Sequence, residues 1–157
     1  MIQIIFRKSH WNKLTSNLAE RTDVESGAYA VYKMSTFNNS QKFLVTKLII
    51  PEEKDYLKRN AVGISFTPEF TENAFQSCEK TNGHLLDIHT HPWSDNVNFS
   101  PIDDREAKHT KIPYMAKYVP STSIAFIVFG KVAEIAKARY WKGPSVLLED
   151  IHRILVI

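Results

Sequence analysis

The sequence predicts an α/β (α+β) fold in which helices flank a central mixed β-sheet. Short runs rich in β-branched and aromatic residues alternate along the chain with segments whose apolar residues recur at helical spacing. The most apolar run, residues 123–130, predicts a central strand. A chain of 157 residues, of which 43% are hydrophobic, suits one globular domain that spans residues 1–157.

Eight segments have the composition of β-strands. The first is a β-branched run, and the second alternates between apolar and polar residues. The turn signal at residues 38–40 joins the second segment to the third and predicts a hairpin. A turn at Gly130 predicts that the two segments around it also pair. The predicted strands are residues 2–7, 27–34, 43–50, 63–66, 85–90, 123–130, 132–141 and 151–157.

Three helices are predicted from their first turns. Ser9 offers an N-cap, and apolar residues follow it at helical spacing. Thr67-Pro68 is an N-cap with proline at the first helical position, and this helix runs to about residue 80 before Gly83 stops it. Ser100-Pro101 opens the third helix in the same way. Loops are predicted over residues 51–60 and 92–99.

Charge and cysteine content argue against several classes of function. The net charge of +3 is too weak to argue for nucleic-acid binding. No stretch approaches the roughly 18 apolar residues of a membrane span. The one cysteine, Cys78, can form neither an internal disulfide nor a cysteine-based zinc site. Because the N-terminus also lacks the pattern of a signal peptide, we expect a cytoplasmic protein.

Residues 87–103 carry the most informative chemistry. His89 and His91 stand two residues apart at the end of a predicted strand, so both side chains project from one face. Asp103 lies in the first turn of the next predicted helix. Two histidines, a carboxylate and one open position are a ligand set of catalytic zinc. The pattern therefore predicts one Zn²⁺ per chain, held by His89, His91 and Asp103.

Each of these features also has an ordinary structural explanation. A His-x-His pair on a strand is often a coincidence. The stretch 100–103 is a good helix start without any metal, because it has a cap, a proline and an early acid. Asp104 and Asp95 compete with Asp103 as the carboxylate ligand. His84 and His109 are expected to be structural or exposed residues.

The segment resembles the metal-binding signature of the JAMM metalloproteases, also called the MPN-plus or JAB family. That signature is a His-x-His-Pro stretch, then a Ser-x-x-Asp stretch, with a glutamate far upstream. Here these are His89-Thr90-His91-Pro92, Ser100-Pro101-Ile102-Asp103 and the glutamate of Glu25-Ser26-Gly27. Glu20 is the alternative upstream glutamate, but it lacks the glycine that follows two residues later. The loop before Ser100 is one residue longer than the family pattern. The resemblance implies a JAB/MPN-like fold, with a cytidine-deaminase-like central mixed sheet flanked by helices, over the whole chain.

The resemblance also assigns roles to these residues. His89, His91 and Asp103 would bind zinc, and the Ser-x-x-Asp spacing favours Asp103 over its neighbour. Glu25 would act as general base and then as general acid. Ser100 would donate a hydrogen bond to the oxyanion of the tetrahedral intermediate. Trp93 would either line the substrate groove or simply cover the loop.

The implied reaction is hydrolysis of an amide bond at the C-terminal tail of a ubiquitin-like protein, by deconjugation or by precursor processing. The implied partners are that protein or its conjugate, together with E1-like and E2-like proteins. Bacterial relatives work in sulfur-carrier metabolism or in anti-phage conjugation systems. An extended tail would bind as an added strand at a sheet edge, after residue 60 or near Trp93.

Other functions compete with this interpretation. A metal-free MPN-type scaffold would only bind partners, but such members usually lack one or more of the site residues. A metallo-β-lactamase-type enzyme needs an Asp-His soon after the histidine pair, whereas Pro92-Trp93 follows here. The DNA-repair-associated branch of the same fold usually has a glycine-rich loop after the His-Pro pair, and the loop of this chain is not glycine-rich. A peptidase that acts on a sulfur-carrier protein stays open as an alternative.

Overall fold

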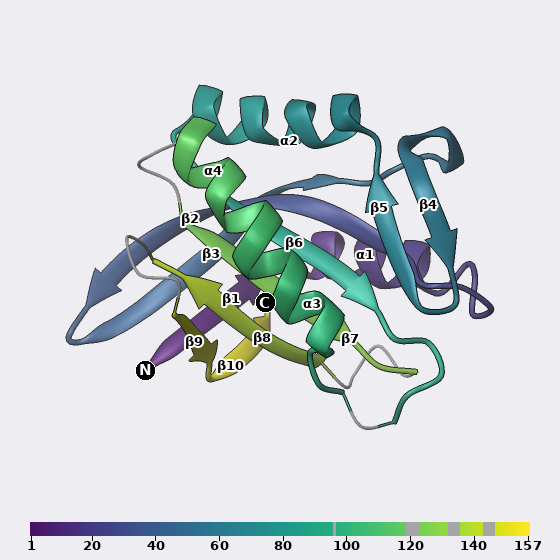
Figure 1. The fold of residues 1–157 in the computed structure, drawn as a ribbon. Helices are drawn as coiled ribbons and strands as arrows, with labels where there is room; N and C mark the ends of the chain where they lie inside the picture. Colours follow the sequence, from purple (N-terminus) through teal and green to yellow (C-terminus); the bar gives the residue numbers. More distant parts are fainter. Residues whose placement is uncertain (96, 119–122, 132–135, 143–146) are drawn as a thin grey trace.

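A large mixed sheet forms the centre of the protein in the computed structural model, which describes residues 1–95, 97–118, 123–131, 136–142 and 147–157 (Figure 1). Its eight strands lie in the order β10-β1-β3-β2-β6-β7-β8-β9, and β4 and β5 pair as a separate ribbon. This mixed sheet with flanking helices confirms the predicted α/β class. The strands are β1 (Ile2–Phe6), β2 (Gly27–Phe37), β3 (Ser40–Ile49), β4 (Tyr56–Asn60), β5 (Gly63–Phe66), β6 (His84–Thr90), β7 (Ile124–Phe129), β8 (Ala136–Trp141), β9 (Leu148–Ile151) and β10 (Arg153–Val156). The helices are α1 (Lys8–Leu18), η1 (Glu53–Asp55), α2 (Pro68–Thr81), α3 (Pro101–Glu106), the π-helix η2 (Ala107–Lys111) and α4 (Ile112–Tyr118).

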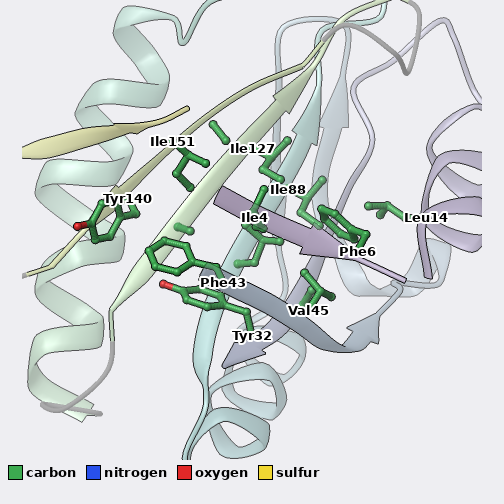
Figure 2. Packing of buried hydrophobic residues seen from close by; sticks show 14 of the residues in the cluster. Ile4, Phe6, Leu14, Tyr32, Phe43, Val45, Ile88, Ile127, Tyr140 and Ile151 are labelled. Atoms are coloured by element: carbon green, nitrogen blue, oxygen red, sulfur yellow. The ribbon is translucent and has the colours of Figure 1, made fainter. Parts of the chain in front are cut away.

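Two apolar cores cover the two faces of the sheet. Side chains alternate between the faces along a strand, so Ala28 and Tyr32 of β2 join one core while Tyr29 and Val31 join the other. The first core packs against α1 through Leu14 and includes the side chains drawn in Figure 2. The second core packs against α2 and α4. Strand β6 lies between β2 and β7 and is almost entirely buried, so its end is held firmly on both sides.

Two predicted boundaries move in the structure. Helix α1 begins at Lys8 with Arg7 as its N-cap, so Ser9 is not the cap. The amide of Lys8 instead donates to the carbonyl of Ile157, 2.6 Å away, which satisfies a first-turn donor from the end of the chain. Helix α2 is capped at Thr67 as predicted, but its left-handed C-terminal residue is Asn82 rather than Gly83. Asparagine tolerates that conformation better than most residues do.

The predicted loop over residues 51–60 is wrong. Residues Glu53–Asp55 form a short 3₁₀-helix, and Tyr56–Asn60 form β4, which pairs antiparallel with β5. Most side chains of β4 are polar and partly exposed, because the strand belongs to a two-stranded ribbon outside the main sheet. The apolar alternation that marks a half-buried strand is therefore missing from its sequence.

The predicted C-terminal strand is two strands in the structure. β9 pairs with β8 at one end of the sheet order, and β10 pairs with β1 at the other end, although only His152 separates them. The chain therefore joins the two edges of the sheet. His152 fastens this bend, because its amide donates to the carbonyl of Ile2 and its Nδ1 accepts from the amide of Ile2. The predicted strand 132–141 is described from Ala136, and residues 132–135 lie outside the described residues.

No helix among the described residues is long and apolar enough to span a bilayer.

Gly27 marks a close approach between β2 and its neighbours. A methyl group added there would meet the side chain of Ile64 and would lie 2.8 Å from the carbonyl oxygen of Ile88. The backbone atom cannot yield without disturbing the pairing of β2 with β6. We expect Gly27→Ala to destabilise the fold by about 1–3 kcal/mol, as overpacked cores do. Urea unfolding measures this, with Gly63→Ala as the matched control, because its nearest atom would be a lysine Nζ at 3.8 Å. Equal stability of the two variants would contradict the close approach.

His84 joins the starts of β6 and β7 in its neutral form. Its Nδ1 accepts from the amide of Ser123 at 2.9 Å, and burial lowers the pKa of the imidazole. Because the folded pKa is the lower one, the unfolded chain gains protons first as the pH falls through the ordinary histidine value of about 6.5. The stabilisation by His84 is therefore complete above that value and declines below it.

We expect His84→Asn, which keeps an acceptor near Ser123, to lose less stability than the natural protein between pH 7.5 and pH 5.5. Urea unfolding at both pH values measures the difference. His109→Asn serves as the control, because His109 is exposed on η2. An identical pH dependence in the natural protein and the His84 variant would contradict this role.

Candidate metal centre

The two histidines of the site stand at the end of β6. His89 lies within the strand, and His91 continues its line because the amide of His91 donates to the carbonyl of Phe129 on β7. Both residues are 8% exposed, and their ring centres are 5.0 Å apart. The sequence prediction of two neighbouring imidazoles at a strand end is therefore correct in place and direction.

Asp103 meets both histidines from the first turn of α3. Its Oδ1 lies 3.2 Å from Nε2 of His89, and its Oδ2 lies 3.4 Å from Nε2 of His91. The same carboxylate accepts from the amide of Ser100 at 2.6 Å, while Oγ of Ser100 accepts from the amide of Asp103 at 3.1 Å. This reciprocal capping box fixes the carboxylate at the helix N-terminus, where the dipole favours negative charge.

These three side chains could hold a metal ion. Their ligand atoms all lie within 4.8 Å of one another. Nε2 of His89 is buried, and its contact with Oδ1 of Asp103 lacks the geometry of a hydrogen bond. A buried polar atom without a partner needs an explanation, and an ion on this nitrogen supplies one. Two imidazole nitrogens and a carboxylate oxygen are a donor set of divalent transition metals.

The electrostatics of the pocket keep the carboxylate ionised. Burial alone would raise the pKa of Asp103 and is the largest single influence, but the adjacent imidazoles of His89 and His91 together hold that pKa well below its ordinary value. The hydrogen bond to Asp103 in turn raises the pKa of His91, against the effect of burial. A histidine binds a metal ion through a neutral imidazole nitrogen. A bound ion would therefore replace the proton that Asp103 stabilises on His91.

Glu25 approaches the same imidazole nitrogen of His91 that Asp103 approaches. It is 5% exposed, and its Oε1 is 3.8 Å from Nε2 of His91. Burial raises the pKa of this carboxyl to about 7, although the neighbouring histidines oppose the shift. A group with this pKa can both accept and donate a proton at neutral pH. Glu25 thus lies beside His91, one of the three side chains that could hold a metal ion.

The ribbon β4–β5 holds the Glu25 segment in place. Arg59 of β4 donates from Nε to the carbonyl of Glu25 at 3.1 Å and from Nη2 to Oγ of Ser26 at 2.6 Å. The hydroxyl of Tyr56 bonds both the amide and the carbonyl of Gly27. The sequence does not predict either contact, because both residues lie in the segment predicted as a loop and about thirty positions from their partners.

Other residues named from the sequence lie outside the ligand group. The ring of Trp93 is stacked on His91 at 6.0 Å between centres and is 52% exposed, so it covers one side of the site. Asp104 turns away from the histidines and pairs with Arg139. His84 and His109 do not join the group, as expected, and Asp95 is exposed in the loop.

A cavity of about 230 Å³ opens beside the site. His89, Asp103 and Glu25 share its wall with Ile64 of β5. Two basic residues that sequence analysis did not single out also line it. They are Lys111, which pairs with the buried Asp87, and Arg139. Neither has a local pattern that marks it, because their partners lie 24 and 35 positions away in the sequence.

Comparison with known proteins supports the fold alone. No protein-family model matches the chain, and no curated protein matches it. The solution structure of protein DSY2949 from Desulfitobacterium hafniense is similar, with a TM-score of 0.59 over 98% of this chain and 92% of that one. Sequence identity is 13%, so the similarity concerns the arrangement of strands and helices.

We expect the natural protein to bind one divalent metal ion, and His89→Ala and Asp103→Ala each to lose it, because each removes one of three ligands. Metal analysis by mass spectrometry after gel filtration measures the stoichiometry. His109→Ala is the matched control, since this histidine is exposed and outside the group. A natural protein that takes up no zinc or cobalt would contradict the metal centre.

Proposed function

We propose that the protein is a zinc-dependent peptidase or isopeptidase that hydrolyses an amide bond at the C-terminal tail of a ubiquitin-like protein. The observation that carries this proposal is the group of His89, His91 and Asp103 with a buried glutamate 3.8 Å from one ligand. Two histidines and one carboxylate with an open position are a recurring form of catalytic zinc. Zinc in this group would supply a water activated at neutral pH.

Glu25 would move the proton in this reaction. Amide hydrolysis needs a base for the attacking water and an acid for the leaving amine. With a pKa raised to about 7 by burial, the carboxyl is suited to take a proton in the first step and return it in the second. Arg59 and Tyr56 hold the backbone of its segment through hydrogen bonds to the carbonyls of Glu25 and Gly27.

Ser100 has a hydroxyl hydrogen to offer the substrate. Its Oγ accepts from the amide of Asp103, so the capping role occupies a lone pair and leaves the proton available. A hydroxyl at this place can donate to the oxygen that gains negative charge in the transition state. Such a donor typically lowers the activation barrier by about 2.7–4 kcal/mol.

The family and the partners are parts of the same proposal. The order of Glu25, the histidine pair and the Ser100–Asp103 turn supports membership of the JAMM/MPN-plus group. The proposed setting is the cytoplasm. The cavity beside the site is bordered by β5, whose residues 63–66 pair with β4 in the ribbon. An extended tail in this cavity would bring its scissile bond over the ligands. The substrate would be a ubiquitin-like protein or its conjugate, supplied by E1-like and E2-like proteins.

We expect Glu25→Gln to retain the metal and to lose at least a hundredfold in the rate of tail cleavage, because it keeps the shape of the side chain but not the base. The assay follows release of a C-terminal extension from a ubiquitin-like fusion, alongside metal analysis of the same sample. Glu20→Gln is the control, since Glu20 is exposed at the end of α1. Normal cleavage by the Glu25 variant would contradict the assigned base, and metal-loaded natural protein without cleavage of any such fusion would contradict the substrate.

A further inference from the structure

Arg139 on β8 holds the segment that carries Ser100 and Asp103 at both of its ends. Its Nη1 lies 2.5 Å from Oδ1 of Asp104, and its Cζ lies 3.7 Å from the centre of the Phe99 ring. Phe99 immediately precedes Ser100, and Asp104 immediately follows Asp103. The two contacts therefore bracket the four residues of the capping box.

The same arginine is linked to the histidine strand. Arg139 pairs in register with Phe126 on β7, and Phe126 pairs with Asp87 on β6, two residues before His89. The ring of Phe99 also faces His89, with 6.3 Å between centres. Arg139 therefore connects the start of α3 to the same sheet that positions His89.

The fold itself gives little reason for an arginine here. The side chain is 12% exposed, and its Nε and Nη2 are buried without a hydrogen-bond partner among the described residues. Buried donors without partners destabilise a protein, and apolar replacements of buried charged groups are often neutral or stabilising. Asp104 is 44% exposed, so water can solvate it when the pair is broken. Because Arg139 is expected to destabilise the fold, we explain its presence by the residues that it positions.

We propose that Arg139 is a positioning residue for the metal centre. By fixing Phe99 and Asp104, it fixes the direction in which Asp103 presents its carboxylate to His89 and His91. Ligands that are ordered before the ion arrives bind it more tightly, and loss of such supporting contacts typically weakens metal affinity 10–100-fold. This inference rests on the metal centre of the proposed function, but not on its peptidase activity.

The test compares Arg139→Met with the natural protein, using Co²⁺ as the probe. Competition with a chelator gives the affinity, the visible absorption reports the coordination geometry, and urea unfolding of the metal-free proteins gives the stability. We expect Arg139→Met to bind Co²⁺ at least tenfold more weakly, with a changed spectrum, while its metal-free form is no less stable. Arg105→Met is the matched control on α3, because Arg105 is exposed, and it should leave all three measurements unchanged.

The outcomes separate this inference from the proposed function. Unchanged affinity and spectrum in Arg139→Met would overturn the positioning role and leave the metal centre intact. A loss of stability in step with the loss of affinity would show a merely structural residue and would also overturn it. If Arg139→Met does not fold, Asp104→Asn removes one of the two contacts at a half-exposed site, and natural affinity there overturns the inference. If the natural protein binds no Co²⁺, the variants cannot be compared, and that result counts against the proposed function itself.

Discussion

The carboxylate of Asp103 is the point on which the site depends, because it serves two structures at once. It accepts the amide of Ser100 and so begins α3, and it faces Nε2 of both histidines at the end of β6. A helix start and a strand end are thereby joined through one side chain. The helix cap and the two imidazoles favour an ionised carboxylate that faces inward, which is the state that a metal ligand would need.

Each segment of the site is then fixed by a second contact from a different strand. The backbone of Glu25 and Gly27 is held by Arg59 and Tyr56 of β4, and the amide of His91 is held by β7. The strands themselves are held by two apolar cores on opposite faces of the sheet. Because neighbours from several strands surround Glu25, His89, His91 and Asp103, these four titratable side chains can stay close together. This is the arrangement expected where chemistry, rather than stability, has set the residues.

Local sequence patterns predict many of the helices and strands and the histidine pair of the site. The helix starts at Thr67 and Ser100 are marked by a cap followed by proline, and the histidine pair is marked by its spacing on an apolar strand. What local pattern cannot predict is long-range: β4 is polar because it lies in a separate ribbon, and the C-terminal segment divides at His152 because it joins both edges of the sheet. Arg59 and Arg139 were missed for the same reason. Their partners are distant in sequence, and a lone arginine has no periodicity to reveal it.

The two arginines suggest how this fold reconciles a buried acidic site with stability. Glu25 and Asp103 are both largely withdrawn from water, yet neither is paired directly with a cation of fixed charge among the described residues. A guanidinium placed on either carboxylate would neutralise it and would compete with a metal ion. Arg59 and Arg139 instead bind the neighbours, at Ser26 and at Asp104. The two arginines thus fix each segment in position without binding either carboxylate, which leaves both carboxylates available for the metal ion and the proton transfer that we propose. The buried donors of Arg139 that lack hydrogen-bond partners are expected to destabilise the fold.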